Sequence, residues 1–264
     1  MTRARIPSAP HVESVTAAMT YCVGIQVNDG LVFASDTRTS AGVDDVRTYN
    51  KMHVFEFPGE RALVILSAGN LATTHAILAQ LRRDLENPQA PVSLRSTPAM
   101  YDAAEYLGGV STRAQKETAA QSQYGGVDLR VTLILGGQIG AEAPGLYLIY
   151  PEGNCIASSP ETPYLQLGES KYGKPILDRI IRPEVSLEDA ARCALVSLDS
   201  TMKSNLSVGA PLDLALLRRD QLGLTHKLRL DVDTPYFANL REAWGRHIAD
   251  ALRSLPKFDW EQAP

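Results

Sequence analysis

The sequence predicts an α+β fold in which two antiparallel β-sheets are stacked and covered by helices on both outer sides, a four-layer αββα sandwich. The main observation is that strand-like and helix-like segments come in blocks, in the order ββββ, αα, ββ with a short third strand, αα, ββ, α. Parallel sheets need a helical crossover between strands, so this order argues against a doubly wound fold. No linker, repeat or low-complexity stretch follows residue 19, so residues 20–264 are predicted to form one domain.

The first block is predicted to be two successive hairpins. "TYCVGIQV" (20–27) and "LVFAS" (31–35) are rich in strand formers and are separated by "NDG", a hairpin-turn signal. "MHVFEF" (52–57) alternates between apolar and polar residues. After the turn "PGE", the nearly continuous apolar run "RALVILSAG" (61–69) is typical of a buried strand.

From residue 70 onward, the spacing of the apolar residues is typical of helices. Residues 70–86 carry apolar residues at helical spacing behind Asn70, a suitable N-cap, and a second helix is predicted over about 98–116, weakened by Gly108 and Gly109. The next strands are predicted at 129–137, 145–151 and 155–158, followed by helices at 171–181 and 186–203 and by strands at 212–220 and 225–232.

The last predicted helix, residues 235–255, has an apolar stripe. The stripe consists of Phe237, Leu240, Trp244, Ile248, Ala251 and Leu255. Such a stripe most simply packs on the domain itself, so we expect that here. A contact in an assembly is the alternative, because aromatic residues are favoured in interface cores.

Composition and charge exclude several classes of function. The chain is 44% hydrophobic and 21% charged, as in ordinary globular proteins. Its net charge of -4 gives no basic surface for nucleic acid or an anionic membrane, so neither is expected as a partner. No apolar run is long enough to span a bilayer. Three cysteines without a Cys-x-x-Cys pair favour a reducing cytoplasm.

The junction "MT" at residues 19–20 suggests the chemistry. If Thr20 were the first residue of the mature chain, its hydroxyl would be a nucleophile that carries its own base, because a free α-amine titrates near neutrality. Such a device needs a cation, a carboxylate that holds it, and N–H donors for an oxyanion. Asp36 ends the second strand, Lys51 opens the third, and Gly69 ends the fourth, so these residues are the candidates.

At this point the sequence resembles a known family. The stretches "MTYCVGI", "DGLVFASDTRTSAG" and "LSAGN", with Lys51 between the last two, resemble proteasome β-type N-terminal-nucleophile (Ntn) hydrolases, most closely the bacterial ancestral β-subunit (Anbu) group. The resemblance extends from Thr20 to about Leu217. It implies the Ntn-hydrolase αββα sandwich and self-association into a homo-oligomer, which in the Anbu group is an open spiral. It implies no metal or organic cofactor.

The resemblance also implies roles for the candidate residues. Thr20 would be the nucleophile and, through its amine, the base. Lys51 would lower the pKa of that amine, and Asp36 would hold the lysine. The N–H of Gly69 would bind the oxyanion, and Thr39 and Ser40 would border a cleft in which an extended peptide pairs with the backbone.

The second half departs from the family pattern. Where the family has a Gly-Ser-Gly turn, this chain has "LGESKYG", so Glu169 or Ser170 occupies the place of the serine. Where the family has an Asp followed by a Ser three residues later, the chain has "SNLSVG", with Asn205 and Ser207 near those positions. Asparagine hydrogen-bonds but does not compensate a positive charge. These four residues are expected either to be auxiliary to the site or to serve as caps and turns.

Residues 1–19 are interpreted as a removable leader or as sequence before the true start. Proteasome propeptides generally end in glycine, whereas Met19 precedes Thr20 here. Translation that begins at Met19, followed by removal of this methionine, is the favoured route to a free Thr20. Self-cleavage between Met19 and Thr20 is the alternative. An intact chain would keep the amine in an amide, and we expect it to be inactive.

Other chemistries have weaker support. "STMK" (200–203) fits a Ser-x-x-Lys motif but has no Lys-Thr-Gly triplet and falls at the end of a helix. The five histidines lack metal-ligand spacing, and the glycine-rich "GGQIGAEAPG" does not open a helix.

The sequence therefore predicts a cytoplasmic threonine-type peptidase or amidase that acts on peptide or amide substrates within a proteasome-like homo-oligomer. Two alternatives stay open. The chain could be a non-proteolytic assembly subunit that keeps the fold without turnover, or an amidase that acts on a small non-peptide amide.

Overall fold

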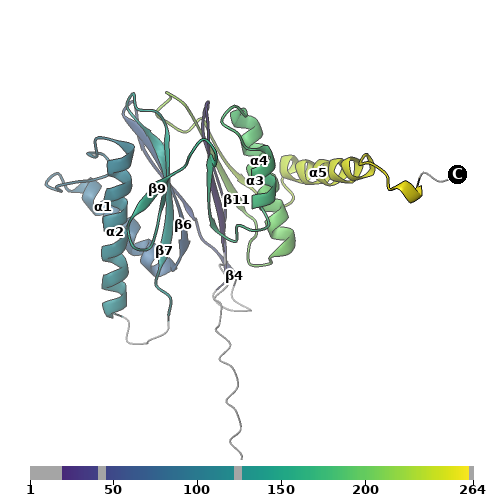
Figure 1. Cartoon of the computed structure of the whole chain (residues 1–264). Helices are drawn as coiled ribbons and strands as arrows, with labels where there is room; N and C mark the ends of the chain where they lie inside the picture. Colours follow the sequence, from purple (N-terminus) through teal and green to yellow (C-terminus); the bar gives the residue numbers. More distant parts are fainter. Residues whose placement is uncertain (1–19, 41–45, 122–126, 262–264) are drawn as a thin grey trace, which may run out of the picture.

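Two five-stranded antiparallel sheets lie face to face between two layers of helices (Figure 1). The computed structural model describes residues 20–40, 46–121 and 127–261, with the side chains of Ser40 and Val46 not described. The leader predicted over residues 1–19 lies outside these ranges. The layer order confirms the αββα sandwich that the block order of the sequence predicted.

The first sheet has the strand order β10-β1-β2-β11-β12. Its strands are β1 (Tyr21–Val27), β2 (Gly30–Asp36), β10 (Tyr164–Gly168), β11 (Leu212–Arg218) and β12 (His226–Leu230). The predicted first hairpin is confirmed: β1 pairs with β2 so that Val27 lies opposite Gly30 and Cys22 lies opposite Ser35. This pairing brings the start of β1 next to the end of β2.

The second sheet is a meander with the strand order β5-β6-β7-β8-β9. Its strands are β5 (Met52–Phe57), β6 (Arg61–Gly69), β7 (Val131–Ile139), β8 (Gly145–Ile149) and β9 (Cys155–Ala157). A separate two-stranded ribbon, β3 (Arg38–Ser40) and β4 (Val46–Thr48), follows the end of β2. The second predicted hairpin is confirmed by the pairing of β5 with β6.

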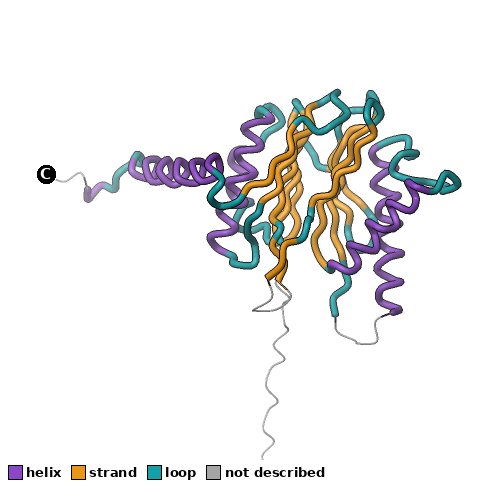
Figure 2. The backbone as a smooth tube through the Cα atoms, turned by 180° about the vertical axis from the view of Figure 1, so that it is seen from behind, coloured by secondary structure: helices purple, strands orange, loops and turns teal. Residues whose placement is uncertain are grey.

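Helices α1 (Leu71–Glu86) and α2 (Met100–Gln121) cover the second sheet, and α3 (Lys174–Ile180) and α4 (Leu187–Ser204) cover the first (Figure 2). The predicted N-cap is confirmed, since Asn70 accepts a hydrogen bond from the Thr73 N–H at 3.0 Å. Helix α5 (Pro235–Arg253) and a short 3-10 turn η1 (Asp259–Glu261) end the described chain. Within the described ranges, no helix combines the length and apolar composition that crossing a membrane requires.

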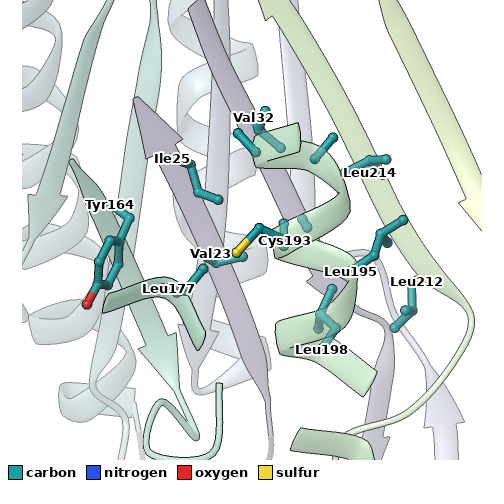
Figure 3. Packing of buried hydrophobic residues seen from close by; sticks show 14 of the residues in the cluster. Val23, Ile25, Val32, Tyr164, Leu177, Cys193, Leu195, Leu198, Leu212 and Leu214 are labelled. Atoms are coloured by element: carbon teal, nitrogen blue, oxygen red, sulfur yellow. The ribbon is translucent and has the colours of Figure 1, made fainter. Parts of the chain in front are cut away.

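Strand β1 is buried on both faces because it lies between a helical layer and the second sheet. Val23 and Ile25 point toward α4 and pack with its side chains (Figure 3). Cys22 faces the other way, into the apolar layer between the two sheets. Because successive side chains of a strand point to opposite faces, β1 contributes both to the core beneath the helices and to the core between the sheets.

The prediction missed the β3–β4 ribbon, which was interpreted as a loop, and it differs from the structure at strand β10 and at the end of helix α2. Strand β10 was missed, because "YLQLG" is a five-residue edge strand with only short apolar alternation. Helix α2 continues to Gln121, five residues beyond the prediction, and passes through Gly108 without a break. A Cβ at Gly108 would lie 2.0 Å from the Gly153 carbonyl oxygen, so this glycine allows a loop to pack closely against the helix.

The expectation that the apolar stripe of α5 packs on the domain was wrong for most of its length. Phe237 is fully buried and Leu240 and Trp244 are half-buried, but Ile248 and Leu255 are 48% and 58% exposed. Figure 1 shows the reason: α5 meets the helical layer only at its first turns and then runs away from the body.

His53 on β5 leads to an expected pH dependence of stability. Burial, with Arg82 and His75 nearby, lowers its pKa from 6.5 to about 4. The unfolded chain therefore binds this proton at a higher pH than the folded chain does. The free energy of unfolding should fall as the pH drops from about 6.5 to 4, by at most about 1.4 kcal/mol per pH unit.

Urea unfolding at pH 7 and pH 5 measures this dependence, with His53→Gln as the matched variant. The variant should lose part of the decline seen in the unaltered protein. An equal decline in both proteins would contradict the assignment to His53.

Candidate active site

Thr20, Asp36 and Lys51 meet at one carboxylate oxygen. The Thr20 hydroxyl donates a hydrogen bond to Asp36 Oδ1 at 3.0 Å, and Lys51 Nζ donates to the same oxygen at 2.7 Å. The three residues are 5%, 0% and 7% exposed. A hydroxyl, a carboxylate and an ammonium group are thus held together away from bulk water, where their interactions are stronger than at a surface.

The two sheets position these side chains jointly. Thr20 precedes β1 and Asp36 ends β2, so the first hairpin brings the hydroxyl and the carboxylate together. Lys51 precedes β5 in the other sheet, and its carbonyl oxygen accepts a hydrogen bond from the Ser67 N–H on β6 at 3.0 Å. The ion pair between Asp36 and Lys51 therefore joins the first sheet to the second.

Backbone groups complete the surroundings of the Asp36 carboxylate. The Tyr21 N–H donates to Oδ1 at 3.0 Å and the Gly209 N–H donates to Oδ2 at 3.3 Å. Lys51 Nζ also donates to the Arg38 carbonyl oxygen at 2.6 Å. A buried ion pair is tolerated when further hydrogen bonds satisfy its remaining donors and acceptors, and these contacts supply them. Sequence reasoning missed Gly209 and Arg38, because their contribution comes from backbone atoms that carry no residue-specific signal.

The carbonyl group of Thr20 is held from the opposite side. The Glu169 N–H donates to the Thr20 carbonyl oxygen at 2.8 Å. The preceding Gly168 has a φ of +76°, and a Cβ there would lie 2.0 Å from that oxygen. Only glycine fits this close approach without strain. Gly168 was also missed, although a glycine at the end of a strand is a usable signal.

Glu169, Asn205 and Ser207 form a polar cluster beside Thr20. Asn205 Nδ2 donates to Glu169 Oε2 at 3.0 Å, and Asn205 Oδ1 accepts from the Ser207 hydroxyl at 2.6 Å. Lys171 Nζ lies 3.6 Å from Glu169 Oε1. Among the described residues, Ser170 takes part through its backbone, whose N–H donates to the Gly168 carbonyl oxygen at 2.9 Å. Of the two residues considered for this place, Glu169 is the one whose side chain joins the cluster.

Gly69 ends β6, two residues after Ser67, and pairs with Val131. Its φ is +117°, and a Cβ there would lie 2.2 Å from the Arg130 carbonyl oxygen. A side chain at position 69 would therefore clash with the backbone of Arg130 and Val131.

The ribbon β3–β4 begins two residues after Asp36. Thr39 is half-buried and pairs with Arg47, and the Ser40 backbone pairs with Val46. The side chain of Ser40 lies outside the described parts of the chain. Thr37, between β2 and the ribbon, donates through its hydroxyl to the Pro211 carbonyl oxygen at 2.7 Å, which ties the ribbon to the start of β11.

The thiol of Cys22 is a poor competitor for the Thr20 hydroxyl. Burial raises the pKa of Cys22 to about 12, so the thiolate is disfavoured at neutral pH. Its Sγ donates weakly to the Ser67 carbonyl oxygen at 3.7 Å. No group of three or more His, Cys, Asp or Glu side chains within the described ranges is arranged to hold a metal ion.

Known proteins similar to this chain share its architecture. The family model described as "Proteasome subunit" matches residues 18–216. The structure of Anbu (ancestral beta-subunit) from Yersinia bercovieri is 43% identical, with 91% of this chain and 100% of that chain covered and a TM-score of 0.85. The structure titled "Helical Assembly of the Anbu Complex from Pseudomonas aeruginosa" is 45% identical, with 92% and 100% covered and a TM-score of 0.85. A proteasome subunit beta from Haloquadratum walsbyi is 26% identical over 211 residues, which is 80% of this chain and 78% of that protein.

Proposed function

The chain belongs to the proteasome-subunit family, with its Anbu group among the similar structures, and from this premise we propose that it is a threonine-type peptidase or amidase. In this proposal residues 20–264 are the mature domain and Thr20 is its first residue. The observation that carries the proposal is the single carboxylate oxygen of Asp36 that binds both the Thr20 hydroxyl and the Lys51 ammonium group.

The proposed reaction is acyl transfer through Thr20. The α-amine of Thr20 takes the hydroxyl proton while Oγ1 attacks the carbonyl carbon of the scissile amide. The resulting oxyanion is stabilised by the Gly69 N–H, and the C–N bond then breaks as the leaving nitrogen receives the proton. The ester on Thr20 is hydrolysed by a water molecule that the same amine activates. No metal or organic cofactor takes part in this proposal.

Lys51 and Asp36 have separate roles in the proposal. The Lys51 ammonium group disfavours protonation of a neighbouring amine, so it keeps the base neutral near pH 7. Asp36 holds that ammonium group in place and accepts the hydrogen bond of the hydroxyl before the reaction. The contacts at 2.7 and 3.0 Å support this assignment.

The polar cluster is proposed to be auxiliary to the same site. Glu169 binds the Thr20 carbonyl group through its backbone N–H. Asn205 binds the Glu169 side chain, and Ser207 in turn binds Asn205. Ser170 contributes through its backbone to the same turn. An extended peptide is proposed to lie along Thr39 and Ser40 by strand pairing.

We further propose that the chain self-associates into a multi-subunit assembly and acts in the cytoplasm. The structure titled as a helical assembly supports the first proposal for this family. Three free cysteines support the second, since disulfide bonds are rare in a reducing compartment.

Intact-mass measurement combined with an α′,β′-epoxyketone tests the catalytic proposal, because this electrophile reacts with a hydroxyl and an amine on the same residue. A chain that begins at Thr20 should gain the mass of one inhibitor. A matched chain with one alanine in front of Thr20 has the hydroxyl but not the free amine, and it should stay unlabelled. An unlabelled chain that begins at Thr20 would contradict the proposal.

The chain that begins at Thr20 also distinguishes the two alternative functions, an amidase for small amides and a non-proteolytic assembly subunit. A chain that is labelled and cleaves small amides but no member of a peptide library would be an amidase. A chain that assembles but is neither labelled nor active would be an assembly subunit. Both routes to a free Thr20 predict a mature mass without residues 1–19. Translation from Met19, the favoured route, gives this mass without a longer precursor. Self-cleavage gives it only after the full chain has been made.

A further inference from the structure

Tyr21 directly follows the proposed nucleophile and is the first residue of β1. It is fully buried, and its ring packs in the core beneath α4. Its side chain nevertheless ends in a hydroxyl group, which has no part in the reaction proposed above. A buried hydroxyl group needs hydrogen-bond partners, and the partners of this one connect it to the candidate active site.

Two side chains from different elements bind the Tyr21 hydroxyl. Gln166 Nε2 on β10 donates a hydrogen bond to Tyr21 Oη at 2.6 Å. Ser197 Oγ on α4 lies 2.5 Å from the same Oη and completes a second hydrogen bond. Burial raises the pKa of Tyr21 to about 12, so the hydroxyl stays protonated at neutral pH and keeps both contacts.

Gly173, the residue before α3, closes the space around this hydroxyl. A Cβ at Gly173 would lie 2.2 Å from Ser197 Oγ and 2.5 Å from Tyr21 Oη. The backbone of Gly173 therefore packs directly against both hydroxyl groups, and a larger residue would have to move them. The tip of the Tyr21 side chain is thus held where β10 meets α3 and α4.

The backbone of Tyr21 is bound to the candidate active site. The peptide unit between Thr20 and Tyr21 has both of its polar groups hydrogen-bonded. Its carbonyl oxygen accepts from the Glu169 N–H at 2.8 Å, and its N–H donates to Asp36 Oδ1 at 3.0 Å. The Thr20 hydroxyl donates to the same Asp36 oxygen.

Gln166 links the tip of the tyrosine to this peptide unit. Besides its contact with Tyr21 Oη, Gln166 Nε2 donates to the Ser170 carbonyl oxygen at 3.3 Å. Ser170 follows Glu169, whose N–H binds the Thr20 carbonyl group. One side-chain amide therefore joins the Tyr21 hydroxyl to the turn that holds Thr20.

We propose that Tyr21 is a positioning residue whose hydroxyl, held by Gln166 and Ser197, fixes the peptide unit that attaches Thr20 to the fold. This inference rests on the proposed function, in which Thr20 begins the mature chain. A first residue has a single covalent link to the protein. Because a peptide unit is planar, fixing it leaves only rotations about the Cα–C and Cα–Cβ bonds of Thr20 to place Oγ1.

The rate of epoxyketone labelling tests this role in a chain that begins at Thr20. Tyr21→Phe keeps the ring and removes the hydroxyl. The maximal rate of labelling should fall about tenfold, since a misplacement of about 1 Å can cost about 10²-fold. The inhibitor concentration that gives the half-maximal rate should not change, because the Tyr21 side chain is fully buried. The pH midpoint of labelling should also stay the same, because the phenol carries no charge in this range.

Tyr106→Phe is the matched control. The Tyr106 hydroxyl also donates to a side chain, Asp84, at 2.5 Å, but it joins α2 to α1 over the other sheet. This variant should lose stability to urea as Tyr21→Phe does, and it should be labelled at the rate of the unaltered chain. The comparison separates positioning of Thr20 from a general loss of stability.

Ser197→Ala tests the same contact from the side of its partner. It should slow labelling less than Tyr21→Phe does, because Gln166 still holds the hydroxyl. The double variant Tyr21→Phe, Ser197→Ala should be no slower than Tyr21→Phe alone, since both changes remove one shared contact. Ser197→Ala also keeps the inference testable should Tyr21→Phe fail to fold.

Several results would overturn the inference. They are unaltered labelling of Tyr21→Phe, equal slowing in Tyr106→Phe, and effects of Tyr21→Phe and Ser197→Ala that multiply in the double variant. A shifted pH midpoint or half-maximal concentration in Tyr21→Phe would also overturn it, because the phenol would then act on protons or on the inhibitor. If the unaltered chain that begins at Thr20 is not labelled, the proposed function fails together with this inference. If that chain is labelled and Tyr21→Phe is labelled equally fast, only this inference fails.

Discussion

Replacing Thr20 with alanine should abolish epoxyketone labelling and lower amide hydrolysis by about 10⁴-fold or more, since loss of a covalent nucleophile removes the reaction path itself. The α-amine, Lys51 and Asp36 all remain in the Thr20→Ala chain. Stability should fall by only about 1–2 kcal/mol, because Asp36 loses one of its hydrogen bonds and keeps those from Lys51, Tyr21 and Gly209. Mass spectrometry and substrate hydrolysis measure the first effect, and urea unfolding measures the second.

Thr20→Ser is the matched control, because it keeps both a hydroxyl and an α-amine. It should still be labelled by the epoxyketone and should retain measurable turnover. If Thr20→Ala were labelled or active at the level of the unaltered protein, the nucleophile would have to be another residue. If both variants were inactive but folded, the methyl group of threonine would be essential for positioning the hydroxyl.

Asp36→Asn should have the largest effect on stability, with a loss of about 3–5 kcal/mol. Lys51 is buried, with 7% of its surface exposed, and its ammonium group would lose the carboxylate that it pairs with, which is the costly way to break such a pair. Both oxygens of Asp36 accept hydrogen bonds, from the Thr20 hydroxyl and the Gly209 N–H among others. In asparagine an NH₂ group would replace one of these oxygens, so one hydrogen-bond donor would face another donor. Labelling of Thr20 should be lost with the fixed position of Lys51.

The double variant Asp36→Asn, Lys51→Met separates charge from geometry. Without the buried ammonium group, it should recover much of the lost free energy of unfolding but none of the labelling. Urea unfolding and epoxyketone labelling of the three proteins decide the matter. Equal instability of the single and double variants would show that hydrogen-bond geometry, not charge, causes the loss. Normal labelling of Asp36→Asn would remove Asp36 from the proposed mechanism.

The layers of the fold could be predicted because local patterns determine them. The turn signal at Asn28 and Asp29 implies the first hairpin, and the hairpin alone brings Thr20 and Asp36 together. Strand β10 could not be predicted in the same way. Five residues of edge strand have too little periodicity, and their conformation depends on pairing with β1, which is distant in sequence.

The side chains of the site were easier to predict than its backbone contacts. Hydroxyl, carboxylate and ammonium groups are residue types with known chemistry at a recognisable spacing. The N–H of Gly209 and the carbonyl of Arg38 are groups that nearly every residue has, so only the folded chain reveals them. The direction of α5 was mispredicted for a related reason: an apolar stripe shows that a helix has a face to cover, but not which surface covers it.

The contact between Asp36 and Gly209 has a consequence for biosynthesis. These residues are 173 positions apart, and β2 carries Asp36 between β1 and β11. A chain emerging from the ribosome has its threonine, aspartate and lysine early, but the donor to Asp36 Oδ2 is translated much later. The surroundings of the Asp36 carboxylate are therefore complete only after Gly209 has been translated and β11 has paired with β2.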